Sequence, residues 1–144
     1  MSLEEGPSHS AIDILYQDDE LLVADKPPGL LVHRSRESSD RVFLLQMLRD
    51  QVGRYLYPVH RLDRAASGAI AFALSSETAR ELQASLTSPT AHKEYLVMVR
   101  GSAADSGEID RPLTDANGKK KEALSRFEKI GEVYRSSLLR VRIF

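Results

Sequence analysis

The clearest signal in this chain spans residues 59–74, which read Val-His-Arg-Leu-Asp-Arg-Ala-Ala-Ser-Gly-Ala-Ile-Ala-Phe-Ala-Leu. Its first part places a single carboxylate, Asp63, between the guanidinium groups of Arg61 and Arg64. Its second part is a run of small and branched apolar residues, which is typical of a buried strand. The sequence therefore predicts a charged loop backed by a rigid strand, a setting in which functional side chains often lie.

We call residues 59–67 the signature loop, and two interpretations of Asp63 stay open on these residues alone. In one, the positive charges of Arg61 and Arg64 keep the carboxylate ionised for chemistry, and the arginines also bind an anionic substrate such as a nucleic-acid backbone. In the other, the three side chains form a solvated cluster of surface ions that contributes little to stability. The loop by itself does not separate these interpretations.

Three more segments accompany the signature loop in a fixed order. Residues 12–24 contain two short apolar runs, residues 25–33 read Asp-Lys-Pro-Pro-Gly-Leu-Leu-Val-His, and residues 93–101 read Lys-Glu-Tyr-Leu-Val-Met-Val-Arg-Gly. Together with the signature loop, they resemble the ordered motifs of the pseudouridine synthases of the RluA type. A further similarity, to the members of that family that modify tRNA, is carried by residues 32–35, 46–53 and 74–77.

The resemblance implies a reaction and roles for four residues. Pseudouridine synthases break the C–N glycosidic bond of a uridine, turn the base and rejoin it through carbon. Asp63 matches the essential aspartate of the family, which acts as nucleophile or as base, and either role needs an ionised carboxylate. Arg61 matches a residue that helps to displace or replace the flipped nucleotide, Arg64 adds positive charge for substrate binding, and Tyr95 matches an aromatic that packs on the uracil face.

The same resemblance implies the partners of the protein. The expected substrate is structured RNA, most of all tRNA, and the alternatives are ribosomal RNA or a role as a catalytically incomplete RNA-binding fragment of the same fold. The isomerisation requires no cofactor and no metal. The sequence agrees, since it contains no phosphate-binding loop, dinucleotide fingerprint or zinc-protease motif.

Several other polar residues receive a structural interpretation. His33 and His60 are read as structural hydrogen-bonding residues, with acid–base or ligand roles as the alternative. Lys26 is expected to support the signature loop without a catalytic role. Without the resemblance, Tyr95 would be read as a half-buried strand tyrosine. Lys119-Lys120-Lys121 is read first as a solvated turn and second as a contact to the RNA backbone.

Composition places the chain among ordinary soluble single-domain proteins. It has 144 residues, of which 42% are hydrophobic and 28% charged, and no apolar run approaches the roughly 20 residues of a membrane span. The absence of cysteine excludes disulfides and thiolate chemistry. No basic-then-apolar signal pattern opens the chain, so we expect a cytoplasmic location without membrane association.

The formal net charge of −1 hides an asymmetry along the chain. Residues 1–25 hold seven acidic residues and no lysine or arginine, so the remaining residues hold all 20 basic residues against 14 acidic ones. Arginine is preferred over lysine, at 14 to 6, and its planar fork suits phosphate better than an ammonium group. A basic body behind an acidic arm permits RNA binding, although a solvated mixed-charge surface explains the charges equally well.

The order of the expected elements predicts an α+β fold. A first helix is expected after caps at residues 38–40 and ends at Gly53, and a second follows a cap at Ser75 or Ser76 and ends before Pro89. We expect strands at residues 12–15, 21–24, 68–74, 93–100, 123–130 and 136–144, and a turn at residues 105–107. Helices fall among the strands without a regular βαβ alternation, which favours a mixed, mostly antiparallel sheet.

Two departures from the family pattern affect these predictions. Ala65-Ala66 stands where relatives usually carry a Pro-Thr or similar pair, although Ser67-Gly68 keeps the expected loop shape. Residues 1–11 read as a flexible leader, and residues 12–144 as a catalytic domain that stops within an apparent strand, before a segment that supplies a basic partner for the aspartate in the family. We therefore expect a domain truncated at its C-terminus, whose activity alone stays open, with an unpaired strand edge at Ile143-Phe144 that supports a homodimer.

Overall fold

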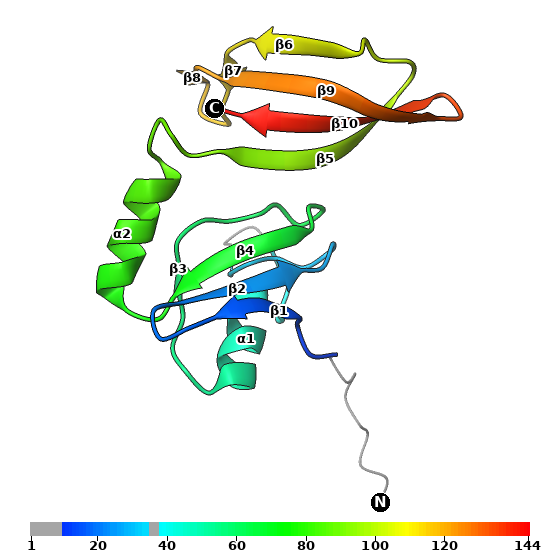
Figure 1. Ribbon diagram of the computed structural model, residues 1–144. Helices are drawn as coiled ribbons and strands as arrows, with labels where there is room; N and C mark the ends of the chain where they lie inside the picture. The colour runs from blue at the N-terminus through cyan, green and yellow to red at the C-terminus, as the bar shows by residue number, and fades with distance from the viewer. Residues whose placement is uncertain (1–9, 35–37) are drawn as a thin grey trace, which may run out of the picture. The chain divides into compact units, whose positions relative to one another are not determined.

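The structure, a computed structural model, describes residues 10–34 and 38–144. Its chain divides into two compact units, Met1–Leu86 and Thr87–Phe144, which we call the N-terminal and the C-terminal unit. Each unit has its own antiparallel sheet (Figure 1), so the predicted α+β class with mostly antiparallel pairing is confirmed. The predicted leader lies, up to residue 9, outside the described residues.

The sheet of the N-terminal unit has the strand order β1-β2-β4-β3, and all its neighbouring strands are antiparallel. The strands span Ile14–Gln17 (β1), Leu21–Lys26 (β2), Tyr57–Pro58 (β3) and Gly68–Ala73 (β4). Asp18 closes the turn between β1 and β2, because its carboxylate accepts hydrogen bonds from the N–H groups of Glu20 and Leu21, each at 2.8 Å. The predicted hairpin and the predicted strand after the signature loop are therefore confirmed.

Two helices complete the N-terminal unit, α1 at Leu44–Val52 and α2 at Ser76–Leu86. Their predicted ends follow local rules. Gly53 closes α1 at φ +65°, and the Ser75 hydroxyl accepts a hydrogen bond from the Thr78 N–H at 3.1 Å at the start of α2. Among the described residues, no helix is long and apolar enough to cross a membrane.

The start of α1 differs from the prediction. Its N-cap is Phe43, which makes no side-chain hydrogen bond to the helix, so the predicted cap at residues 38–40 is wrong. The N–H groups of Leu44 and Leu45 donate instead to the carbonyl oxygens of Leu31 and Val32, both at 2.9 Å. Backbone acceptors from a distant segment thus satisfy donors that a side chain usually takes.

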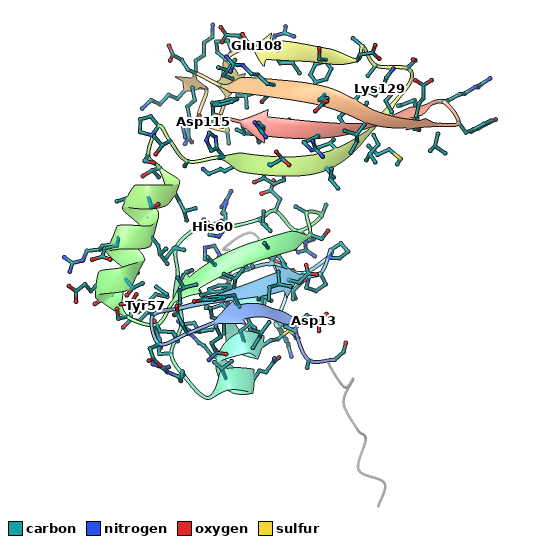
Figure 2. The ribbon with its side chains drawn as sticks, in the orientation of Figure 1. Asp13, Tyr57, His60, Glu108, Asp115 and Lys129 are labelled. Carbon is teal, nitrogen blue, oxygen red and sulfur yellow. The ribbon has the colours of Figure 1, made fainter. Side chains whose placement is uncertain are left out.

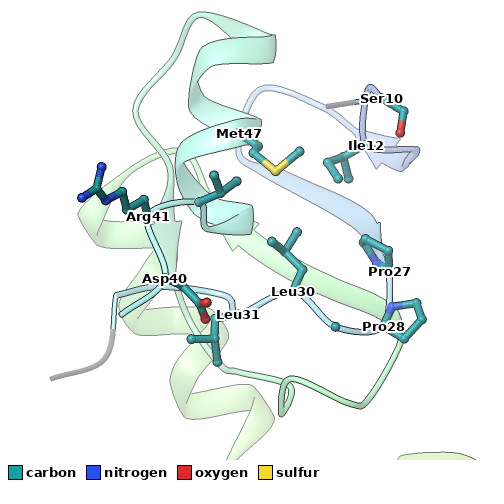
Figure 3. Close-up of a pocket in the computed structure, with 11 residues that line it drawn as sticks. Ser10, Ile12, Pro27, Pro28, Leu30, Leu31, Asp40, Arg41 and Met47 are labelled. Carbon is teal, nitrogen blue, oxygen red and sulfur yellow. The ribbon is translucent and has the colours of Figure 1, made fainter. Parts of the chain in front are cut away.

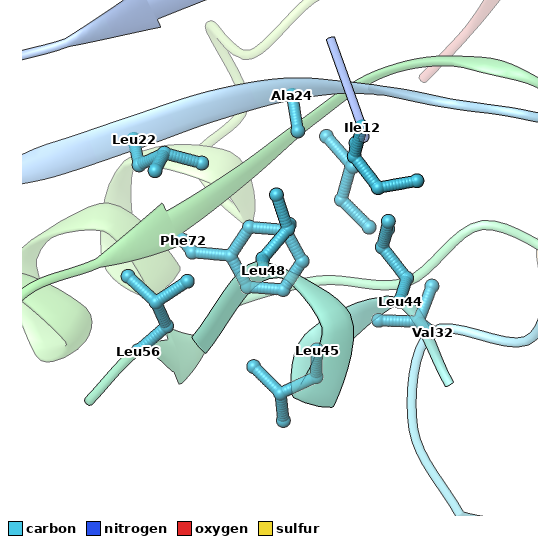
Figure 4. Packing of buried hydrophobic residues seen from close by; sticks show 10 residues of the cluster. Ile12, Leu22, Ala24, Val32, Leu44, Leu45, Leu48, Leu56 and Phe72 are labelled. Atoms are coloured by element: carbon cyan, nitrogen blue, oxygen red, sulfur yellow. The ribbon is translucent and has the colours of Figure 1, made fainter. Parts of the chain in front are cut away.

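The core of the N-terminal unit joins α1 to β2 and β4 (Figure 4). Its buried residues are Ile12, Leu22, Ala24, Val32, Leu44, Leu45, Leu48, Leu56, Ile70 and Phe72. The two strands present their buried side chains in register, since Leu22 pairs with Phe72 and Ala24 with Ile70. Full burial of a side chain such as Leu or Phe contributes about 1.5–3 kcal/mol, so this cluster stabilises the strand that follows the signature loop.

The C-terminal unit contains a sheet with the strand order β5-β10-β9-β6 and a separate ribbon of β7 and β8. Its strands span Lys93–Arg100 (β5), Ser106–Asp110 (β6), Leu113–Thr114 (β7), Lys120–Lys121 (β8), Leu124–Val133 (β9) and Ser136–Ile143 (β10). The three long strands predicted in this part are confirmed. The turn predicted at residues 105–107 is wrong from Ser106 on, because β6 begins there and Gly107 pairs with Phe127. A side chain at position 107 would lie 2.6 Å from the Phe127 ring, which explains the glycine.

Strand β10 lies in the middle of this sheet, paired with β5 on one side and with β9 on the other. The Phe144 N–H also donates to the carbonyl oxygen of Leu124 at 3.0 Å. The predicted unpaired edge at Ile143-Phe144 is therefore wrong, because both neighbours of β10 are provided by the chain itself. The homodimer stays a prediction, without this edge as its reason.

Candidate active site

The signature loop runs from β3 to β4, and Lys26 at the end of β2 holds its backbone. The Lys26 side chain is fully buried. Its ammonium group donates hydrogen bonds to three carbonyl oxygens, those of Ala66 at 2.6 Å, Pro27 at 2.9 Å and Arg64 at 3.2 Å. Two of these acceptors belong to the signature loop, so the predicted supporting role of Lys26 is confirmed.

The charge of Lys26 also interacts with Asp63. Burial lowers the pKa of the Lys26 ammonium, because less water solvates its charge, and the negative charge of Asp63 opposes that shift. The residue that anchors the loop thus also provides a positive charge near the predicted catalytic group.

A second backbone contact joins the signature loop to the segment after β2. The Gly29 N–H donates to the Arg64 carbonyl oxygen at 2.7 Å, and Gly29 has a φ of +86°, a conformation that side chains disfavour. The carbonyl of Arg64 therefore accepts from both Gly29 and Lys26. The Pro-Pro-Gly turn and the signature loop are consequently held together as one structural element.

His60, labelled in Figure 2, has the structural role that the sequence predicted. Strand β3 pairs with β4 over only two residues, Tyr57 with Ala73 and Pro58 with Phe72. Beyond that point the Ala71 N–H donates to the Nε2 atom of His60 at 2.9 Å. The imidazole thus replaces a backbone carbonyl as the next acceptor along β4, which requires a lone pair on Nε2.

Arg64 has a different ion partner from the one that its position suggested. Its guanidinium group forms a very short ion pair with Asp40, and it donates to the Ser38 hydroxyl at 3.2 Å. Within the described residues, no ion pair joins the Asp63 carboxylate to Arg61 or Arg64. The guanidinium of Arg64 therefore neutralises Asp40, and the role of Arg64 toward RNA stays a prediction.

Asp63 lies in a small pocket of about 220 Å³. The pocket is lined by Leu31, Val32, His33, Arg61, Leu62, Asp63 and Arg64. Arg61 and Asp63 are exposed to solvent within it, which makes the carboxylate accessible to a ligand. The structure thus brings three of the four predicted site residues together, and it adds His33, which the sequence had assigned a structural role.

The sequence contained a signal that could have identified His33 as a site residue, because His33 is the last residue of the motif at residues 25–33. The structure gives its side chain no hydrogen-bond partner among the described residues, so the structural interpretation of His33 stays a prediction. Val32 enters the core, whereas His33, in the same bend of the chain, is exposed to solvent.

Tyr95 belongs to the C-terminal unit, whereas every residue that lines the Asp63 pocket belongs to the N-terminal unit. It lies on β5 opposite Val141 and is half-buried, in alternation with the exposed Glu94 and Leu96. Its position matches the half-buried strand tyrosine that would be expected without the family resemblance. Its packing against uracil stays a prediction.

A larger pocket of about 470 Å³ shares Leu31 with the Asp63 pocket (Figure 3). Its walls include the apolar side chains of Ile12, Leu30 and Met47, and Asp40 contributes a carboxylate. No cluster of three or more metal-binding side chains occurs in the described part of the chain. The charged and imidazole side chains that line the Asp63 pocket are those of Asp63, Arg61, Arg64 and His33.

The lysine run at residues 119–121 is solvated as predicted, but the predicted turn is wrong for Lys120 and Lys121, because they form β8 and pair with β7. The Asp115 carboxylate, on the segment labelled in Figure 2, accepts hydrogen bonds from the N–H groups of Asn117 at 3.0 Å and Lys119 at 2.9 Å. All three lysine residues are exposed. A contact to the RNA backbone stays the alternative.

Residues 20–143 match the family model of the RNA pseudouridylate synthases. The chain therefore belongs to the RNA pseudouridylate synthase family, and the resemblance found in its motifs is confirmed. Two solved human structures share the fold. RNA pseudouridylate synthase domain containing 4 has a TM-score of 0.76 and 20% identity over 91% of this chain and 58% of that one. RNA pseudouridylate synthase domain containing 1 has a TM-score of 0.76 and 18% identity over 92% and 59%.

Within this family, the chain is similar to curated proteins named tRNA pseudouridine synthase C. It is 50% identical to the protein of Haemophilus ducreyi over 103 residues, which are 71% of this chain and 42% of that protein. The Pasteurella multocida protein is 48% identical over the same shares, and the Vibrio cholerae protein is 38% identical over 82% of this chain and 49% of its own length. The chain thus spans less than half the length of these relatives.

Proposed function

We propose that this chain carries the catalytic loop of an RNA pseudouridine synthase that isomerises a specific uridine in tRNA. The observation that carries the proposal is the exposed Asp63 in a pocket with Arg61, on a loop that the buried Lys26 anchors. Family membership supports the reaction, and the name shared by the most similar relatives supports tRNA as the substrate.

Asp63 is the proposed catalytic carboxylate. The N1–C1′ bond of the uridine breaks, the uracil turns, and a C5–C1′ bond forms while C5 loses a proton and N1 gains one. Substrate and product therefore have the same composition, and no oxidant or reductant is consumed. An ionised carboxylate serves either as nucleophile at C1′ or as the base that removes a proton from the sugar.

The target uridine must leave its helix to reach Asp63, at a cost of a few kcal/mol of unstacking. Arg61 is proposed to displace or replace the flipped nucleotide, because its guanidinium is exposed at the pocket. Tyr95 is proposed to stack on the uracil, which contributes roughly 1–3 kcal/mol and offsets much of that cost. Arg64 is proposed to bind an RNA phosphate by exchanging its ion pair with Asp40 for one with the substrate.

Release of tritium from tRNA labelled at uracil C5 tests the proposal, since C5 loses its hydrogen when the new bond forms. We expect release by the wild-type chain and none by Asp63→Asn, with unchanged affinity for tRNA. Asp19→Asn, which changes an exposed aspartate in the turn between β1 and β2, is the matched control and retains release. Equal release by the wild type and Asp63→Asn contradicts the proposed role of Asp63.

The same assay tests a second function of this chain. The alternative is a catalytically incomplete RNA-binding fragment, which binds tRNA in a salt-dependent manner and releases no tritium. Release from labelled ribosomal RNA but not from tRNA would identify a ribosomal RNA pseudouridine synthase instead. A chain that neither binds RNA nor releases tritium would contradict all three functions.

A further inference from the structure

We propose that His33 is a positioning residue that binds the sugar–phosphate backbone of the nucleotide entering the Asp63 pocket. The inference rests on the proposed function, because it assigns a further substrate contact at the same site. The side chain of His33 makes no hydrogen bond or ion pair to a described residue, whereas the backbone just before it is fixed by hydrogen bonds.

The two histidines around the signature loop differ in what their imidazoles contact. The Nε2 atom of His60 accepts a hydrogen bond from the Ala71 N–H at 2.9 Å. The side chain of His33 is exposed and makes no hydrogen bond or ion pair to any described residue. A neutral imidazole offers one donor and one acceptor, so both nitrogen atoms of His33 are available to a ligand.

Hydrogen bonds hold the backbone at the two residues that precede His33. The carbonyl oxygens of Leu31 and Val32 accept hydrogen bonds from the first N–H groups of α1, both at 2.9 Å. Val32 is also buried in the core, with 3% of its surface exposed. The starting point of the His33 side chain is therefore fixed, which lowers the entropic cost of binding a ligand.

The size of the pocket restricts what His33 can meet. At about 220 Å³ it is smaller than the roughly 300–1,000 Å³ of pockets that hold drug-sized ligands, so it admits a single nucleoside and not a stretch of RNA. Leu31, Val32 and Leu62 supply apolar wall, and His33, Arg61 and Asp63 supply polar groups.

The proposed reaction indicates which part of the nucleotide His33 contacts. Asp63 must act at the sugar, next to C1′, so the sugar of the reacting nucleotide lies at the carboxylate. A side chain that lines the same pocket then has the ribose hydroxyls and the adjoining phosphate within reach. Both groups match imidazole, since a hydroxyl donates and accepts and a phosphate oxygen accepts.

The test measures steady-state tritium release and tRNA affinity for His33→Ala and His33→Gln in the chain as printed. One neutral hydrogen bond corresponds to about a three- to tenfold effect, so we expect His33→Ala to raise KM and Kd by that factor with little change in kcat. His33→Gln, which keeps a donor and an acceptor, is expected to recover most of the loss. His92→Ala changes an exposed histidine outside the pocket and is the matched control.

The thermal midpoint separates a substrate contact from a structural role. We expect the same midpoint for the wild type, His33→Ala and His33→Gln, because the imidazole has no partner to lose. A lowered midpoint in both variants, or unchanged KM and Kd in His33→Ala, overturns the inference. A wild type that neither binds tRNA nor releases tritium refutes the proposed function, and the role of His33 falls with it. If the wild type binds without release, Kd alone decides the role of His33.

Discussion

The N-terminal unit buries a cluster of apolar residues around α1, whereas of the described C-terminal residues only Ser137 and Leu139 are buried. The C-terminal sheet instead carries ion pairs across one face. Arg142 pairs with Glu94 at 2.9 Å, and Arg140 lies 3.4 Å from Glu94 and 3.7 Å from Glu128. The comparison teaches that apolar burial, the stronger source of stability, is concentrated in the unit that holds the Asp63 pocket.

Two lysines show the same contrast on a smaller scale. Lys26 in the N-terminal unit is buried, and its ammonium group donates to three backbone carbonyls. Lys129 in the C-terminal unit, labelled in Figure 2, pairs with the carboxylates of Asp105 at 3.1 Å and Glu132 at 3.3 Å. Burial lowers the pKa of Lys26, whereas hydrogen bonds to Asp105 and Glu132 raise the pKa of Lys129.

The largest expected effect is on the core, and a pair of leucines tests it. Leu48 is fully buried and Leu96 is 67% exposed. We expect Leu48→Ala to lower the free energy of unfolding by about 3–5 kcal/mol and Leu96→Ala by less than about 1 kcal/mol. Urea unfolding followed by circular dichroism measures both. Similar losses in the two variants would contradict the contrast between the units.

The next effect concerns the anchor of the signature loop. Lys26→Met fills the space but leaves the carbonyls of Pro27, Arg64 and Ala66 without this donor, so we expect a loss of about 2–3 kcal/mol in the free energy of unfolding. The amide protons of the signature loop should also exchange faster with solvent. Lys129→Met is the matched control, with a smaller loss and no change in that loop. If Lys26→Met leaves the free energy of unfolding unchanged, the anchoring role is refuted.

The third prediction concerns proton binding by the two lysines. NMR titration of ¹³C-labelled lysine should place the midpoint of Lys26 below the ordinary lysine value of 10.5 and that of Lys129 above it. The stability that Lys129 contributes is then fully present below pH 10.5 and is lost as pH rises through its higher folded pKa. For Lys26 the sign is reversed: between its folded pKa and 10.5 the unfolded chain binds more protons, so stability rises with pH.

The smallest effect is expected at the exposed ion pairs. Glu94 forms ion pairs with both Arg140 and Arg142, but all three side chains are about half exposed. We expect Glu94→Gln to cost less than about 1 kcal/mol in low salt, and the difference to vanish in about 1 M salt, where charges are screened within about 3 Å. Thermal unfolding at two salt concentrations measures this. A larger loss of stability that persists in salt would show that these ion pairs contribute more to stability than exposed ion pairs usually do.

Features set by neighbours in the chain could be predicted from the sequence. Gly53 ends α1 and Ser75 caps α2 because each acts on the adjacent turn, and the long strands follow from alternation of apolar residues. Three predicted site residues, Arg61, Asp63 and Arg64, line one pocket because they are nearly contiguous in the signature loop. Its other wall, at residues 31–33, was quoted as part of a motif but received no site role.

Features set by distant partners escaped prediction. Arg64 is 24 residues from Asp40, and nothing local distinguishes that partner from Asp63, which is its sequence neighbour. The start of α1 was predicted wrongly because the backbone carbonyls of residues 31 and 32 replace the side-chain cap. Every residue has a backbone carbonyl, so the residue type does not show which one accepts these hydrogen bonds. The central position of β10 depends on the pairing of three strands, which alternation along one strand does not determine.

The imidazole at position 60 gives a side chain a place in the hydrogen-bond ladder of a β-sheet. Any residue supplies a backbone carbonyl, but only a ring nitrogen that carries a lone pair can replace it here. The Ala71 amide requires that lone pair on Nε2, so a neutral ring carries its hydrogen on Nδ1. The strand that leads away from Asp63 therefore depends at this point on the identity of residue 60, whereas pairing through backbone carbonyls requires no particular side chain.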